Sequence, residues 1–297
     1  MELAVYDIAF VGNYTKDTIV SATGTRMVDG GAFNYGAHVA AQMGLKTAAV
    51  TRLAGEDWRV IDRLLRLGMD VFAERTPHST CLRLEYPTAD VDERVIYVTS
   101  TAGSFTPQQV ADVSARVFVV GASFRGEAGP DLFESLAAKG VPIAADVQGF
   151  VRVVRDGKLV YEPWPAAERQ AILGRVGTLK SDAVEAEMLT GTADIHRAAQ
   201  MLADMGPAEI VLTHRGGLLV YAGGEFHEAG FFPAQLVGRS GRGDTCLGAY
   251  VARRLASPPA EATVWAAAVT SLKMEAEGPF ARTMGEVEEL IRQRYSI

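Results

Sequence analysis

The sequence has few of the residues that build disulfide frameworks or metal clusters. Its two cysteines, Cys81 and Cys246, stand in different contexts, and its five histidines are scattered along the chain. This pattern does not fit a disulfide-stapled fold and contains no Cys/His metal motif. We expect a protein of a reducing compartment that folds around an ordinary hydrophobic core.

Positive charge is also in short supply. There are 29 Lys and Arg residues against 36 Asp and Glu, a formal net charge of −7. This balance argues against nucleic acid or an anionic membrane as a partner, but it leaves room for a local basic pocket that binds a small anion. The N-terminus lacks the basic-then-apolar pattern of a signal peptide, and no apolar run approaches membrane-spanning length. We therefore expect a cytoplasmic protein.

The sequence does contain a regular alternation of strand-like and helix-like segments. Residues 6–12 have the pattern of a strand, 34–44 that of a helix ending at a glycine, and 46–53 that of a second strand, and the alternation continues to residue 229. Strands that alternate with helices are typical of βαβ units, whose right-handed crossovers give a parallel sheet with helices on both faces. We predict an α/β fold with a doubly wound, mostly parallel sheet in a single domain, 1–297.

One region departs from this alternation. Residues 80–100 alternate apolar and polar side chains around a turn-rich middle, which indicates an antiparallel hairpin, and residues 17–31 contain one or two further short strands. We expect lid strands to be inserted at about 13–31 and 80–100, because a small sheet suits a cover over the carboxyl ends of parallel strands, where such folds bind ligands. An edge hairpin or a dimer contact is the alternative.

A glycine loop near the C-terminus carries the strongest chemical signal. In "LVGRSGRGDTCLGAYVARRL", three glycines precede Asp244, and a helical apolar pattern follows it. Loop amides and a helix start bind anions, and an aspartate at their edge can take the proton of an attacking hydroxyl during phosphoryl transfer. An aspartate there also commonly just caps the helix. The P-loop and the complete G-x-G-x-x-G fingerprint are both missing.

Five segments, in order along nearly the whole chain, resemble the ribokinase/PfkB family of carbohydrate kinases. "GRSGRGDTCLGAY" resembles the family's C-terminal D-T-x-G-A-G-D signature, and "GGAFNYGAHVAAQMGLKTAAVTRLAGED" is similar to its N-terminal one. "LKSDAVEAEMLTG" resembles the N-x-x-E segment, "VGNYTKD" the first strand with its substrate-binding aspartate, and "AVTSLKMEAEGPF" the closing helix and loop beside the nucleotide base. The ordered set is far more specific than any one of these matches.

The resemblance implies a ribokinase-like α/β fold with a small β lid, and transfer of the ATP γ-phosphoryl group to a hydroxyl with Mg²⁺. It implies that Asp244 is the general base and that Gly241, Arg242 and Gly243 form the anion hole. The implied substrate-binding residues are Asn13, Asp17, Gly30, Gly31, Asn34 and Tyr35. The implied ligands of Mg²⁺, largely through water, are Asp182 and Glu185, and the residues implied near the nucleotide are Lys180, Thr213, Gly217 and Lys273.

The departures from the family pattern are informative. Gly238 and Arg242 replace an aspartate and an alanine of the C-terminal signature, and Asp182 replaces the asparagine of N-x-x-E. Tyr35 stands where many sugar kinases have a substrate-binding asparagine, and Asn34, one residue earlier, lies about 100° away around a helix. The aromatic residue, with "GNYTKD" and "DVQGF", resembles the branch of myo-inositol kinases and some nucleoside kinases. Tyr35 either contacts the substrate or packs under the lid, and Arg242 either faces the phosphoryl group or points to solvent.

Our leading hypothesis is an ATP-dependent phosphotransferase acting on a small polyol, either a sugar or a cyclitol such as myo-inositol. The alternatives are a nucleoside kinase of the same family and a metabolite sensor that keeps the fold without catalysis. The resemblance leaves open a homodimer through the lid. Two further residues end predicted strands: Asp146 is expected to cap a loop or contact the ligand, and His214 to be a polar strand-end residue.

Overall fold

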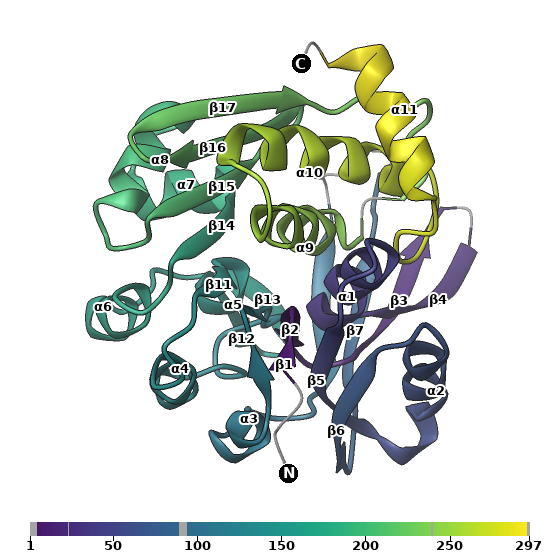
Figure 1. Cartoon of the computed structure of the whole chain (residues 1–297). Coiled ribbons are helices and arrows are strands. Elements are labelled where there is room, and N and C mark those ends of the chain that lie inside the picture. Colours follow the sequence, from purple (N-terminus) through teal and green to yellow (C-terminus); the bar gives the residue numbers. More distant parts are fainter. Residues whose placement is uncertain (1–4, 23, 89–93, 239, 296–297) are drawn as a thin grey trace.

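The computed structural model describes residues 5–22, 24–88, 94–238 and 240–295. Its centre is a nine-stranded sheet in the order β17-β16-β15-β14-β11-β10-β2-β5-β6 (Figure 1). The strands are β2 Ile8–Val11, β5 Thr47–Ala54, β6 Asp70–Thr76, β10 Phe118–Val120, β11 Ile143–Asp146, β14 Thr178–Asp182, β15 Glu209–Thr213, β16 Gly217–Ala222 and β17 Glu225–Gly230. Strands from β15 to β6 are parallel, and β16 and β17 add an antiparallel edge. The predicted doubly wound, mostly parallel sheet is confirmed.

Helices cover both faces of this sheet because the buried strands are apolar on both sides. One hydrophobic cluster holds α1 Ala32–Gln42, α2 Arg59–Arg66, α9 Arg242–Arg254, α10 Pro259–Met274 and α11 Met284–Arg294 against one face. A second cluster holds α3 Gln108–Ala111, α4 Pro130–Ala137, α6 Ala166–Leu173, α7 Ala183–Thr190 and α8 Ile195–Ala203 against the other. Smaller elements are β1 Val5–Tyr6 paired with β9 Ser114–Ala115, the single-turn helix α5 Gln148–Val151 and the 3₁₀ turn η1 Gly55–Asp57.

A second sheet of six strands has the order β12-β13-β8-β7-β3-β4. Its strands are β3 Thr15–Ser21, β4 Gly24–Gly30, β7 Thr80–Glu85, β8 Val95–Ser100, β12 Arg152–Arg155 and β13 Lys158–Tyr161. The stretches 13–31 and 80–100 thus contribute four strands, and β7 and β8 are antiparallel as the sequence predicts. The turn-rich middle predicted for this hairpin includes residues 89–93, which lie outside the described residues.

The β12–β13 hairpin is a finding that the sequence analysis did not anticipate. Its turn consists of Asp156 and Gly157, with φ of 48° and 76°. A two-residue turn with both φ values positive matches the twist of the flanking strands, and Asp-Gly is a preferred sequence for it. The dipeptide between "RVVR" and "KLVY" was therefore a readable hairpin signal.

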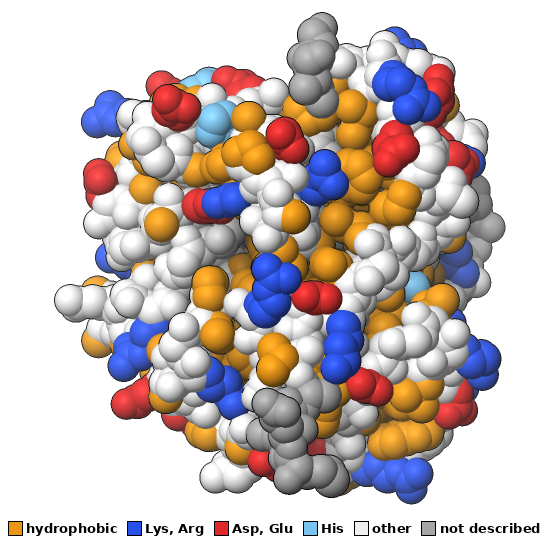
Figure 2. All heavy atoms as spheres, in the orientation of Figure 1, with side chains coloured by type: hydrophobic (Ala, Val, Ile, Leu, Met, Phe, Trp, Pro, Cys, Tyr) orange, Lys and Arg blue, Asp and Glu red, His pale blue; other side chains and the backbone are white. Residues whose placement is uncertain are grey.

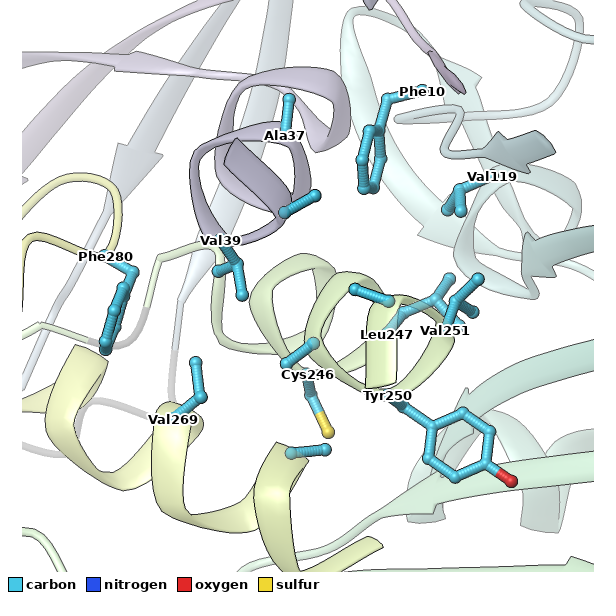
Figure 3. Close-up of a cluster of buried hydrophobic side chains, with 14 of the residues drawn as sticks. Phe10, Ala37, Val39, Val119, Cys246, Leu247, Tyr250, Val251, Val269 and Phe280 are labelled. Carbon is cyan, nitrogen blue, oxygen red and sulfur yellow. The ribbon is translucent and has the colours of Figure 1, made fainter. Parts of the chain in front are cut away.

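Helix α9, which follows the glycine loop, packs in the core between α1 and α10 (Figure 3). Cys246, Leu247 and Tyr250 on α9 are at most 2% exposed. A Cβ on Gly248 would lie 2.7 Å from the Cα of Gly36 on α1, so the two helices touch through their backbones. Burial of each large apolar side chain contributes about 1.5–3 kcal/mol, so the start of α9 is held rigidly at the edge of the sheet.

The surface carries charges of both signs. On the face shown in Figure 2, acidic and basic side chains are interspersed with apolar ones rather than gathered by sign. Among the described residues, no helix combines the length and the apolar character needed to cross a membrane.

Candidate active site

Two cavities meet at the start of α9. The larger has a volume of about 560 Å³ and the smaller about 90 Å³. They share the following wall residues: Arg94, Ile96, Gln148, Arg152, Leu159, Gly241 and Asp244. Both cavities lie between the second sheet and the edge of the central sheet where β14 and β15 end. Ligands of open α/β sheets bind at this edge.

Asp244 stands where the two cavities join. It is the third residue of α9, whose N-cap is Gly241, so its carboxylate does not cap the helix. Burial raises the pKa of Asp244, whereas the charges of Lys180 and Arg152 oppose that rise. The capping alternative is therefore not supported by the helix geometry, and the carboxylate faces both cavities.

The glycines before Asp244 are required by close contacts. Gly241 has a φ of 73°, and a Cβ on it would lie 2.3 Å from the ring of Tyr35. A Cβ on Gly243 would lie 2.7 Å from the Nζ atom of Lys180. The first turn of α9 therefore lies directly on an aromatic ring on one side and on a cation on the other. The first N–H groups of a helix have no partner within the helix, so this turn is a candidate position for an anion.

The larger cavity is rich in cations. Among the described residues, five basic side chains reach its wall: Arg94, Arg152, Lys180, Arg215 and Arg242. Two carboxylates, Asp182 and Asp244, also line it, together with Thr213 and His214. An excess of fixed positive charge in a concave site attracts a polyanion such as a phosphate chain.

The smaller cavity holds three of the residues expected to contact the substrate: Asp17, Gly31 and Tyr35. Asp17 lies on β3 and is 7% exposed, and burial raises its pKa to about 7. The hydroxyl of Tyr35 and the Oδ1 atom of Asp17 are buried and have no hydrogen-bond partner in the protein. Buried polar atoms without partners mark positions where a hydroxylated ligand can complete the hydrogen bonding.

A buried ionic network lies beneath the anion-binding turn. The Nζ atom of Lys180 is 2.9 Å from the Oδ2 atom of Asp146 and 4.0 Å from the Oε2 atom of Glu185. Burial disfavours charge on Lys180, but Asp146 and Glu185 outweigh it and hold the pKa of Lys180 above its ordinary value. Asp146 also accepts a hydrogen bond from the backbone N–H of Gln148, as a loop-capping residue does.

The expected metal ligands are largely committed to protein contacts. Asp182 and Glu185 form a capping box at the start of α7, in which each side chain accepts from the other's backbone N–H. The remaining oxygen of Glu185, Oε1, accepts from the Nη2 atom of Arg152 at 3.2 Å. Within the described ranges, no three Asp, Glu, His or Cys side chains gather as a metal-binding group. Asp182 alone of this pair lines the larger cavity.

Six of the residues predicted for the site lie outside the walls of both cavities: Asn13, Gly30, Asn34, Glu185, Gly217 and Lys273. Asn13 donates to the carboxylate of Glu127, and Asn34 donates to the backbone carbonyl of Asp29. Lys273, whose pKa burial lowers to about 8, lies over the Tyr35 ring and behind the glycine loop. Asn13, Asn34 and Lys273 therefore bond to protein groups and do not line either cavity.

Gly30 and Gly217 allow close packing of strands. A Cβ on Gly30 would lie 2.8 Å from the Oδ2 atom of Asp17, and a Cβ on Gly217 would lie 2.4 Å from the carbonyl oxygen of Ala229. Gly30 therefore gives Asp17 its room, and Gly217 is needed for the pairing of β16 with β17.

The sequence analysis missed five wall residues that both cavities share, from in or beside the second sheet and from α5: Arg94, Ile96, Gln148, Arg152 and Leu159. Three of them lie within or beside the β12–β13 hairpin. Recognising the Asp-Gly turn would have placed this hairpin, but only the tertiary pairing of β13 with β8 brings it over the cavities.

Comparisons with known proteins agree with this geometry. A pyrophosphate-dependent kinase of the ribokinase family, solved with a pyrophosphate analog and myo-inositol, is 32% identical, with a TM-score of 0.87 over 95% of this chain and 99% of that chain. The ribokinase of Arabidopsis thaliana, complexed with ribose and ATP, is 18% identical, with a TM-score of 0.77 over 97% of this chain and 99% of that one, and supports the fold alone. A cytidine kinase of Thermococcus kodakarensis is 26% identical over 87% of this chain and 92% of its own length.

The match to a ribokinase-family kinase at 32% identity and a TM-score of 0.87 shows that the chain has a ribokinase-like α/β fold. The model of the pfkB family of carbohydrate kinases matches residues 2–281, and the chain belongs to this family.

Proposed function

We propose that this protein transfers a phosphoryl group to one hydroxyl of a small polyol, with a cyclitol such as myo-inositol as the first candidate. The observation that carries the proposal is the position of Asp244 between a small cavity with partnerless polar atoms and a large cationic one. The acceptor would bind in the smaller cavity and the phosphate donor in the larger. The relative solved with myo-inositol supports the same acceptor class.

The size of the acceptor cavity favours a compact polyol over a nucleoside. Its volume is about 90 Å³, whereas pockets for drug-sized ligands measure about 300–1,000 Å³. Asp17 and Tyr35 offer partnerless polar atoms to hydroxyl groups, and Leu82 and Leu84 give an apolar side to the cavity. A cytidine-sized acceptor would require the second sheet to move outward.

The donor is a phosphate chain, and we propose inorganic pyrophosphate as the first choice. The five cationic side chains around the larger cavity suit a compact polyanion, and the relatives at 32–33% identity are pyrophosphate-dependent kinases. ATP with Mg²⁺, the donor that the sequence resemblance implies, is the competing candidate. Mg²⁺ would neutralise charge on the donor oxygens, and Asp182, which lines the larger cavity, would help to hold it.

The transfer step follows from the placement of Asp244. The carboxylate accepts the proton of the attacking hydroxyl, a new bond forms between that oxygen and phosphorus, and the bond from phosphorus to the departing phosphate or ADP breaks. The N–H groups of Gly241, Arg242 and Gly243 would hold the oxygens of the moving group at the helix start. The cations of the larger cavity would stabilise the leaving phosphate.

The second sheet would act as the lid expected from the sequence, because its strands supply wall residues to both cavities. Closure over the acceptor would exclude water, which otherwise competes for the phosphoryl group. A homodimer through this sheet and a cytoplasmic location remain predictions.

The test is a transfer assay with pyrophosphate or ATP as donor, each with Mg²⁺, against myo-inositol, simple sugars and nucleosides. General-base catalysis contributes about 10²–10⁴-fold, so Asp244→Asn should lower kcat by that factor and retain acceptor binding. Asp62→Asn, which removes an exposed carboxylate on α2, is the control and should leave kcat unchanged. If the wild type binds a polyol but transfers phosphate from neither donor, the metabolite-sensor alternative replaces the kinase.

A further inference from the structure

Arg152 is one of the five cations around the larger cavity, and its position differs from that of the other four. It is the first residue of β12 and pairs in register with Tyr161 on β13. Its side chain is 15% exposed and forms part of the wall of both cavities. Of the five cations around the larger cavity, only Arg94 and Arg152 also line the smaller one, and Arg94 is solvent-exposed.

The Arg152 guanidinium contacts two neighbouring side chains that hold it in place. Its Nη2 atom donates to the Oε1 atom of Glu185 at 3.2 Å, and the group lies 5.8 Å from the centre of the Tyr161 ring. Glu185 is itself fixed, because its Oε2 atom accepts from the backbone N–H of Asp182 at 2.9 Å. The bond to Glu185 uses one of the five N–H donors of the guanidinium.

This arrangement keeps Arg152 charged in a buried place. Burial disfavours the guanidinium charge, but the nearby carboxylates, led by Glu185, hold the pKa of Arg152 above its ordinary value. A planar guanidinium donates two parallel hydrogen bonds to phosphate oxygens, which a lysine cannot do. The charge also lies close enough to Asp244 to oppose the rise in that carboxyl's pKa.

We propose that Arg152 is a catalytic residue that binds the transferring phosphoryl group from the second sheet, while the helix-start amides bind it from the core. This inference rests on the proposed function. The phosphoryl group must pass from the larger cavity to the smaller one beside Asp244. Arg152 lines both cavities, and its hydrogen bond to Glu185 holds it in place. In this scheme Glu185 is a positioning residue, which orients the guanidinium instead of coordinating a metal.

A purely structural role would predict something different. The Arg152–Glu185 pair joins the second sheet to α7, so it could simply hold the two parts together. In that case, removing Arg152 would lower the melting temperature, and the loss of activity would follow the loss of folded protein. A catalytic role instead lowers kcat of the folded enzyme and makes the loss responsive to an added guanidinium ion.

The experiment compares the wild type with Arg152→Ala, Arg152→Lys and the control Arg155→Ala, which removes an exposed arginine of the same hairpin that pairs with Glu162. We expect Arg152→Ala to lower kcat by about 10³-fold, the lower end of the effect of an arginine that stabilises transferring phosphoryl groups. Arg152→Lys should recover only part of the loss, millimolar guanidinium should restore activity to Arg152→Ala, and Arg155→Ala should match the wild type. Glu185→Gln should lower kcat by a smaller factor.

A binding measurement separates failure of this inference from failure of the proposed function. Calorimetry with inorganic pyrophosphate should show at least about tenfold weaker binding to folded Arg152→Ala than to the wild type, since a charged hydrogen bond of about 1.5–3 kcal/mol is lost. Wild-type kcat in the Arg152→Ala variant, or pyrophosphate affinity equal to that of the wild type, would overturn the role of Arg152. If the wild type catalyses no transfer but its pyrophosphate binding depends on Arg152, the proposed function fails and the anion site of Arg152 remains.

Discussion

Replacing Asp17 by asparagine should stabilise the protein at neutral pH while weakening acceptor binding. Asp17 is 7% exposed on β3, and burial raises its pKa from 3.8 to about 7. The nearby carboxylates of Asp244 and Asp29 add to this rise, whereas Thr15 and Arg94 oppose it. The folded state therefore opposes ionisation of this group, and the Asp17→Asn variant has nothing to ionise.

The sign and size of the effect follow from proton linkage. A carboxyl whose pKa is raised by folding destabilises the folded state once it ionises, so the cost begins as the pH rises above 3.8 and is complete above about 7. At about 1.4 kcal/mol for each pKa unit, the rise amounts to about 4 kcal/mol. Asp17→Asn should therefore melt roughly 5–10 °C higher than the wild type at pH 8, with a much smaller difference at pH 4.5.

The assay is thermal unfolding of both proteins from pH 4.5 to 8, followed by circular dichroism, together with calorimetry of myo-inositol binding. Asp62→Asn, with an exposed carboxylate on α2, should track the wild type across this range. A difference between Asp17→Asn and the wild type that is the same at both ends of the range would refute the linkage argument. Such a result would mean that the change acts through packing and not through the charge of Asp17.

Two further predictions concern the supports of the site. Gly241→Ala places a Cβ 2.3 Å from the buried ring of Tyr35 at a φ of 73°. Because groups in the site must be held to within about 1 Å, kcat/KM should fall by at least about 100-fold. The control Gly285→Ala on α11, where the nearest atom is 4.0 Å away, should match the wild type in steady-state kinetics. Glu127→Gln replaces a buried carboxylate that accepts from Asn13 and from the backbone N–H of Ser123. The NH₂ group of the glutamine must then point at one of these two N–H donors. We expect a loss of about 1–3 kcal/mol in urea unfolding, and an unchanged midpoint would contradict this account.

Local patterns in the sequence were sufficient to predict most of the central fold. Apolar strands alternating with helices that stop at glycines predicted a doubly wound sheet. The spacing of apolar side chains and the residues that end a helix are both set within a few neighbouring positions, so they can be read from the sequence. The sequence also predicted that Asp244 lies at a helix start after a glycine loop, because both features depend on neighbouring residues, and the structure places it in the first turn of α9. The β12–β13 hairpin was missed although its Asp156-Gly157 turn was readable.

Tertiary structure alone decided which of the predicted residues line the two cavities. Asn13 and Asn34 are close to Asp17 and Tyr35 in the sequence, yet neither asparagine lines the smaller cavity. Their side-chain NH₂ groups donate to protein oxygens instead. Glu185 belongs to a readable motif, but its contact with Arg152 joins residues 33 positions apart. The sequence by itself determined most of the elements and the position of the glycine loop before a helix, because both depend on neighbours along the chain. The walls of the two cavities depend on how the second sheet packs against the central one, a set of long-range contacts that no local pattern encodes.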